Sequence, residues 1–144
     1  MLASSVPEHP VVSTRDATTV ARLDSVVIDP ARAAVAALRL RGVGRRDRTL
    51  DWRDVLAFGP DAVTVESAEV FGDPDGRVRE LLDRDWDLLG KRLLSDAGVE
   101  LGTVTDVEFD PVTGSVVSVI GTNGTIPGDR LVGCGSYAVV VRDT

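Results

Sequence analysis

Three closely spaced arginines are the first residues of this sequence that could take part in binding. They are Arg45, Arg46 and Arg48. Guanidinium groups pair with phosphates and carboxylates, so this cluster could contact an anion or an acidic partner. Asp47 and Asp51 lie among the arginines. The alternative is therefore a solvated hairpin tip whose charges are neutralised locally, which is the commoner role of a charge run.

The two tryptophans, Trp52 and Trp86, are further candidates for a contact surface. Tryptophan is enriched among the residues that dominate binding energy at interfaces. A packing role is the alternative for both, and Trp86, between two aspartates, would hold a linker helix against a β-barrel. The interface candidates are thus Arg45, Arg46, Arg48, Trp52 and Trp86.

Residues suited to catalysis or metal binding are few. The chain has one histidine, His9, and one cysteine, Cys134, which excludes a His/Cys zinc cluster and a disulfide within one chain. Cys134 has no histidine near it in sequence that could act as its base. We therefore predict no catalytic residue, no metal site, no cofactor and no enzymatic activity.

Three alternating carboxylates form the remaining chemical pattern. Asp106, Glu108 and Asp110 would share one face of a strand, where they could bind a hard cation such as Ca²⁺. An outward polar face of a half-buried strand explains the same spacing. We favour that explanation, because Asp110 also precedes Pro111 in a predicted turn.

The charge balance restricts the kinds of partner. The 144 residues include 16 basic and 23 acidic ones, a net charge of -7, and residues 73–144 carry 7 basic against 13 acidic. This surplus disfavours direct nucleic-acid binding, which depends on neutralising phosphates. No apolar run is long enough to span a bilayer, and residues 1–10 do not form a secretory signal, so we expect a cytoplasmic protein.

The elements that must position these residues are short, valine-rich strands. We predict strands at 20–28, 35–40, 63–65, 101–109, 115–120 and 137–141, a spacing typical of an all-β fold. Residues 26–30 align with 107–111 at an offset of 81, and 59–65 align with 135–141 at an offset of 76. The difference of five residues falls in the arginine-rich loop. The pattern predicts two copies of one β-unit that pack against each other through a pseudo-two-fold contact or exchange strands.

The predicted domain organisation follows from this repeat. Residues 1–10 form a flexible lead-in, 11–70 the first copy, 71–87 a linker, and 88–144 the second copy. The linker contains a short helix at about 75–85, with Asp73 as N-cap and Pro74 as its first residue. Glycines flanking Cys134 indicate a turn. The turn after Asp29-Pro30 lacks the glycine that follows Asp110-Pro111, so we expect it to be longer, or helical.

The second copy resembles a PRC-barrel domain, over residues 88–143. The resemblance rests on Leu88-Leu89-Gly90-Lys91 and on the Asp110-Pro111-Val112-Thr113-Gly114 turn. The first copy keeps the strand pattern but lacks the Leu-Gly-Lys motif. The family takes its name from the photosynthetic reaction-centre H subunit and includes a ribosome-maturation factor. The resemblance implies two tandem small β-barrels joined by a short linker helix.

Members of that family serve mainly as binding and assembly modules without catalysis. The resemblance therefore implies a non-catalytic interaction module that binds another protein or a second copy of itself, as a homo-oligomer. One alternative is an adaptor, similar to a ribosome-assembly factor, that binds a basic protein. Another alternative is a barrel that binds a small ligand or an ion.

Overall fold

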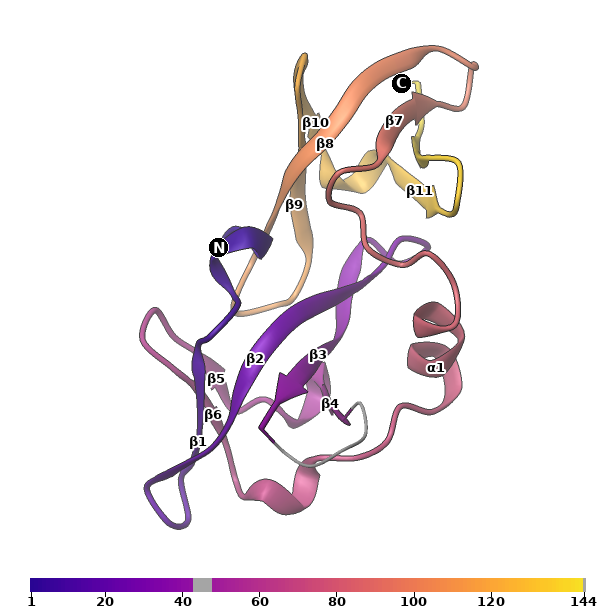
Figure 1. Cartoon of the computed structure of the whole chain (residues 1–144). Coiled ribbons are helices and arrows are strands. Elements are labelled where there is room, and N and C mark those ends of the chain that lie inside the picture. Colours follow the sequence, from indigo (N-terminus) through magenta and orange to yellow (C-terminus); the bar gives the residue numbers. More distant parts are fainter. Residues whose placement is uncertain (43–47, 144) are drawn as a thin grey trace.

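The computed structural model describes residues 1–42 and 48–143 and shows two six-stranded β-sheets with one short helix (Figure 1). The first sheet contains β1 (Pro10–Ser13), β2 (Thr18–Asp29), β3 (Ala34–Arg41), β4 (Arg48–Asp51), β5 (Ala57–Phe58) and β6 (Val63–Val65). The second contains β7 (Arg92–Ser95), β8 (Glu100–Phe109), β9 (Val116–Gly121), β10 (Gly124–Pro127), β11 (Leu131–Cys134) and β12 (Val139–Val141). The helix α1 (Gly76–Leu82) lies between them in sequence, and four short 3-10 helices complete the fold: η1 (Ala3–Ser5), η2 (Trp52–Asp54), η3 (Ala68–Val70) and η4 (Gly128–Arg130).

The two sheets have the same strand order. The first runs β4-β3-β2-β1-β6-β5 and the second β10-β9-β8-β7-β12-β11, so each strand has a counterpart six places later. The parallel pairs also correspond, because Val11 faces Val63 in the first sheet and Leu93 faces Val139 in the second. Two small all-β units joined by a short helix are the predicted fold class, which is confirmed.

One hydrophobic core joins both sheets. Leu23 and Leu38 of the first sheet belong to the same buried cluster as Val107 and Phe109 of the second. The strand β2 reflects this position: its exposed and buried residues mix at the start, but from Val26 onward every residue is buried, as expected where a strand is covered on both faces. Units of this size bury a smaller share of their surface than larger domains do, so the shared core adds burial where each unit alone is marginal.

The two sheets also exchange backbone hydrogen bonds. Val35 N donates to Gly114 O, and Val116 N donates to Ala33 O, both at 2.8 Å. The two bonds are equivalent, because Val35 corresponds to Val116 and Ala33 to Gly114 at the offset of 81. Between them, Ala34 forms a β-bridge with its own counterpart Ser115. Such reciprocal bonding between equivalent residues defines a local pseudo-two-fold axis. The predicted contact between the units is therefore present at the β2–β3 and β8–β9 turns.

Residues 1–10 are not the flexible lead-in that the sequence predicts. They contain η1, and β1 begins at Pro10. The side chain of Val6 is fully buried in the core, and the backbone amide of Phe109 donates to Met1 O at 2.9 Å. The N-terminal segment therefore lies along β8, where Leu2 forms a β-bridge with Glu108. The letter N in Figure 1 marks this end of the chain. Burial of Val6 and the added backbone hydrogen bonds account for its fixed position.

Two local predictions around the linker and β11 were wrong. The helix α1 falls within the predicted 75–85, but its N-cap is Asp75 and not Asp73. Both aspartates suit an N-cap, so the residue type alone did not separate them. Gly133 and Cys134 lie in β11, where Cys134 pairs with Val139, and do not form the predicted turn.

The two units share a left-handed backbone conformation at three turns but differ there in residue type. Gly90, Gly98 and Gly114 have φ of 82°, 81° and 81° in the second unit. Ala17 and Ala33 are the counterparts of Gly98 and Gly114 at the offset of 81, with φ of 56° and 50°. Glu8, with φ of 74°, corresponds to Gly90 at an offset of 82, since its amide donates to Leu23 O as that of Gly90 donates to Val104 O. The missing glycine led us to expect a longer or helical turn after Asp29-Pro30. That expectation is wrong. Instead Ala33 adopts the left-handed conformation that Gly114 adopts, at a cost of about 1 kcal/mol.

Replacement of Ala17 by glycine is expected to stabilise the protein by about 0.5–1 kcal/mol. Ala17 is exposed, so the substitution relieves a strained φ without loss of packing. The reverse substitution at its counterpart, Gly98→Ala, should destabilise the protein by about 1 kcal/mol, because no atom lies near the added Cβ and only the φ is unfavourable. Urea unfolding curves of both variants test the prediction, and a loss of stability in Ala17→Gly would contradict it.

Candidate functional site

Of the three arginines in the predicted cluster, the structure describes only Arg48. Arg45 and Arg46 lie outside the described residues. Arg48 is the first residue of β4 and is half-buried, and its guanidinium Nη2 donates to the carbonyl of Phe71 at 2.9 Å. This bond ties β4 to the segment that follows η3. Arg48 is thus engaged within the chain.

Trp52 packs against the shared core. Its ring meets Phe109 edge-on at a centroid distance of 6.3 Å and lies 6.1 Å from Phe58. It also covers Gly114, where a Cβ would come within 2.8 Å of the indole. The glycine at this turn therefore makes room for the tryptophan of the other unit. These contacts give Trp52 a packing role, and part of its half-buried ring remains at the surface.

Trp86 lies in the segment between α1 and β7, away from Trp52. The guanidinium of Arg39 lies over its ring, 5.6 Å from the centroid, in cation–π geometry. Trp86 also borders a cleft of about 290 Å³ between the N-terminal segment, β2, β3 and β8. The polar side chains in this cleft are those of Ser4, Asp24, Ser25, Arg39 and Asp87. The structure does not bring the two tryptophans into one cleft.

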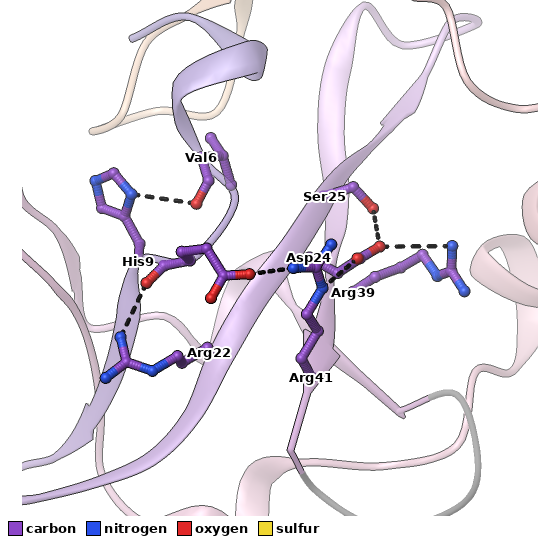
Figure 2. A network of polar contacts seen from close by, with 8 residues as sticks. Val6, His9, Arg22, Asp24, Ser25, Arg39 and Arg41 are labelled. Atoms are coloured by element: carbon purple, nitrogen blue, oxygen red, sulfur yellow. Dashed lines mark hydrogen bonds and ion pairs between the residues drawn. The ribbon is translucent and has the colours of Figure 1, made fainter.

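A network of charged side chains lies beside this cleft (Figure 2). Asp24 of β2 accepts hydrogen bonds from Arg41 Nε at 2.6 Å and from Ser25 at 3.1 Å, and Arg39 lies 3.7 Å away. Arg41 also pairs with Glu8. Burial disfavours the charged form of Asp24, but its hydrogen bonds and the two arginines outweigh burial and lower its pKa. The network therefore stays charged at neutral pH and fixes the N-terminal segment to β2 and β3.

The residues considered for catalysis or metal binding have structural contacts. The two ring nitrogens of His9 lie 3.1 and 3.2 Å from the carbonyls of Val6 and Pro60. The thiol of Cys134 lies 3.3 Å from the carbonyl of Asp85, and burial raises the pKa of this thiol, against the opposing effect of Lys91. Cys134 is therefore protonated at neutral pH and unsuited to nucleophilic attack.

Two of the three alternating carboxylates, Asp106 and Asp110, are likewise held by nearby groups. Asp106 accepts a hydrogen bond from the backbone amide of Ser4 at 3.1 Å, and Asp110 Oδ1 accepts from the amides of Val112 and Thr113 within its turn. Across residues 1–42 and 48–143, no three His, Cys, Asp or Glu side chains are grouped so that they could hold a metal ion.

An open apolar groove lies where the first unit meets the β8–β9 turn. We call it the Leu56–Val112 groove. It has a volume of about 210 Å³ and is lined by Trp52, Val55, Leu56, Ala57, Phe58, Pro111 and Val112. Leu56 is 61% exposed and Val112 is 85% exposed, so two large apolar side chains from different units face solvent together. Exposed apolar side chains gathered at a groove are candidates for an interaction surface.

Sequence reasoning missed both residues that give the groove its character. Leu56 precedes a strand of two residues, and Val112 occupies the centre of the Asp-Pro-Val-Thr-Gly turn. An apolar residue at a turn centre is unusual and could have signalled an exposed contact at Val112. No local signal places Leu56 beside it, because the pairing of the two units creates that contact.

Comparison with known proteins agrees with the architecture of the second unit. Within the described part of the chain, no helix is both long and apolar enough to cross a membrane. No curated protein matches the sequence. The match to a protein family covers one region, so the predicted tandem repeat is not confirmed by it. Residues 80–143, which include the end of α1 and the whole second sheet, match the PRC-barrel domain family.

Proposed function

We propose that this protein is a non-catalytic cytoplasmic module that binds another protein through the Leu56–Val112 groove. The observation that carries the proposal is the joint exposure of Leu56 and Val112 in one groove at the junction of the units. Trp52 and Phe58 form the rigid floor beneath them, and rigid aromatic side chains bind at low entropic cost.

We further infer that the first unit is a diverged copy of the PRC-barrel unit. The shared strand order and the reciprocal hydrogen bonds at the junction support this inference. So does the left-handed backbone at Glu8, Ala17 and Ala33, which repeats the conformation of three glycines in the second unit. Loss of those glycines would weaken any sequence match to the family while the fold persists.

A basic protein is the second candidate partner. The acidic surplus of residues 73–144 supports it, because opposite charge accelerates association and restricts the choice of partner. Such binding would weaken strongly as salt screens the charges, whereas binding through an apolar groove would not. Salt dependence therefore separates the two modes.

Simultaneous replacement of Leu56 and Val112 by serine is expected to reduce capture of the partner from native lysate by about tenfold or more, because the apolar contact is lost. Both side chains are exposed, so the fold should be retained. Val99→Ser is the matched control, since Val99 is 53% exposed and does not line the groove.

Quantitative mass spectrometry of the captured protein at low and moderate salt measures the effect. Equal capture by the double variant and by Val99→Ser would contradict the groove as the binding surface. If raised salt abolishes capture by the wild type, the double variant and Val99→Ser alike, the acidic residues of 73–144 would be favoured as the binding surface instead.

A further inference from the structure

The Leu56–Val112 groove has a counterpart on the opposite side of the pseudo-two-fold axis. That counterpart, which we call the α1-lined groove, contains Pro30 and Ala31 of the β2–β3 turn and Val132, Gly133 and Cys134 of β11. Pro111, Val112, Leu56, Ala57 and Phe58 occupy the same places at offsets of 81 and 76. Both grooves have a volume of about 210 Å³.

Helix α1 forms one wall of this second groove. Leu81 of α1 lines it, together with Arg84 and Trp86 of the segment that follows α1. Leu81 is buried, and the carbonyl of Asp85 lies 3.3 Å from the Cys134 thiol. The apolar residues Val78 and Leu81 are both buried and lie three positions apart, as on one face of an amphipathic helix. A short helix therefore packs along the edge of this kind of groove, with Leu81 toward it.

A charge pair anchors that helix beside its groove. Arg77 of α1 donates to both carboxylate oxygens of Asp29, at 2.9 and 3.0 Å, and Asp29 also accepts the amide of Ala31. The counterpart of Asp29 is Asp110, which accepts the equivalent turn amide of Val112 at 2.8 Å. Among residues 1–42 and 48–143, no arginine or lysine forms an ion pair with Asp110. The open side thus has the aspartate but not the arginine.

We propose that the Leu56–Val112 groove binds a short amphipathic helix of a partner protein, and that this helix carries an arginine or lysine toward Asp110. The proposal rests on the proposed function and names the partner's chemistry. The basic residue would stand one turn before an apolar residue, as Arg77 stands before Leu81 in α1. Leu56 and Val112 are larger than their counterparts Val132 and Ala31, so the partner helix would lie on a more apolar floor than α1 does.

The test places a photo-cross-linking amino acid in place of Leu56, and in a control protein in place of Val99. After irradiation in native lysate, sequencing of the adduct identifies the partner segment. We expect adducts from position 56 and none of the same kind from position 99. The cross-linked segment should contain the basic and apolar residues at helical spacing, and a synthetic peptide of that sequence should bind as a helix by NMR.

A second measurement tests the charge. Asp110→Asn keeps the oxygen that accepts the turn amides but removes the carboxylate charge, and it should weaken peptide binding about fivefold. Glu69→Gln, an equal loss of charge at an exposed residue of η3, should leave binding unchanged. Fluorescence anisotropy of the labelled peptide gives both dissociation constants.

The outcomes separate the two proposals. An adduct at position 56 with an extended segment, with a segment that lacks a basic residue, or with a second copy of this chain would overturn the helix proposal and leave the groove as a binding surface. Equal binding by Asp110→Asn and Glu69→Gln would also overturn it. A partner that is captured without any adduct at position 56 would overturn the groove itself.

Discussion

Replacement of Gly128 by alanine is expected to destabilise the protein by about 3 kcal/mol or more. Gly128 is buried at the start of η4, and an added Cβ would lie 1.9 Å from the carbonyl oxygen of Val116 and 2.5 Å from its carbonyl carbon. Both atoms belong to the backbone of β9, which cannot move without disturbing the bond from Val116 N to Ala33 O at the junction.

Denaturant unfolding followed by tryptophan fluorescence measures this change. Gly133→Ala is the matched control, since the added Cβ at Gly133 meets no atom within 4 Å and φ there is not in the left-handed region. We expect its effect to be within about 0.5 kcal/mol. A Gly128→Ala protein as stable as Gly133→Ala would mean that η4 does not pack against β9 as described.

Replacement of Arg77 by alanine should cost about 2 kcal/mol at neutral pH. Asp29 is 3% exposed, and the substitution leaves its carboxylate buried without the guanidinium that contacts both oxygens. Arg77 itself is 40% exposed, so solvent screens part of the interaction and we expect less than for a fully buried pair. Arg79→Ala on the same helix, which loses a 3.7 Å surface pair with Asp83, should cost about 0.3 kcal/mol.

The effect of Arg77→Ala should depend on pH in a defined direction. The hydrogen bonds from Arg77 lower the pKa of Asp29 below its ordinary value of 3.8, although burial opposes the shift. A lowered folded-state pKa stabilises the native protein above the unfolded pKa, and the stabilisation is lost as pH falls through the folded-state pKa. The difference in unfolding free energy between wild type and Arg77→Ala should therefore shrink below about pH 4. A difference that stays constant from pH 7 to pH 3 would contradict the role of this ion pair.

The long hairpins were predictable from sequence because they carry strong local signals. Alternating apolar residues and the Asp-Pro turns at Asp29 and Asp110 predict β2–β3 and β8–β9. The strands β1, β4, β5, β7, β10 and β11 have two to four residues, which is too short for a periodic pattern, whereas the equally short β6 and β12 were predicted from their valines. They form because neighbouring strands supply hydrogen-bond partners. For the same reason Val6 was misassigned to a flexible segment, since its burial depends on β8 and not on its neighbours in sequence.

The candidate site was less predictable than the fold. Trp52 and Trp86 were identified by residue type, and the structure gives both of them intramolecular contacts. The Leu56–Val112 groove was missed because its two exposed side chains are far apart in sequence and line one groove only where the β8–β9 turn meets the first unit. Residue type can nominate single side chains, but this groove is a property of tertiary arrangement.

The reciprocal bonds between Ala33–Val35 and Gly114–Val116 have a consequence for stoichiometry. In an isologous dimer, both copies of every surface patch are identical, so such an assembly offers its binding sites in pairs. Here the same kind of contact lies within one chain, and the two sides have diverged: α1 forms a wall of one groove, and no residue of α1 lines the other. A symmetric dimer of single units would bind two partners, whereas this chain should bind one.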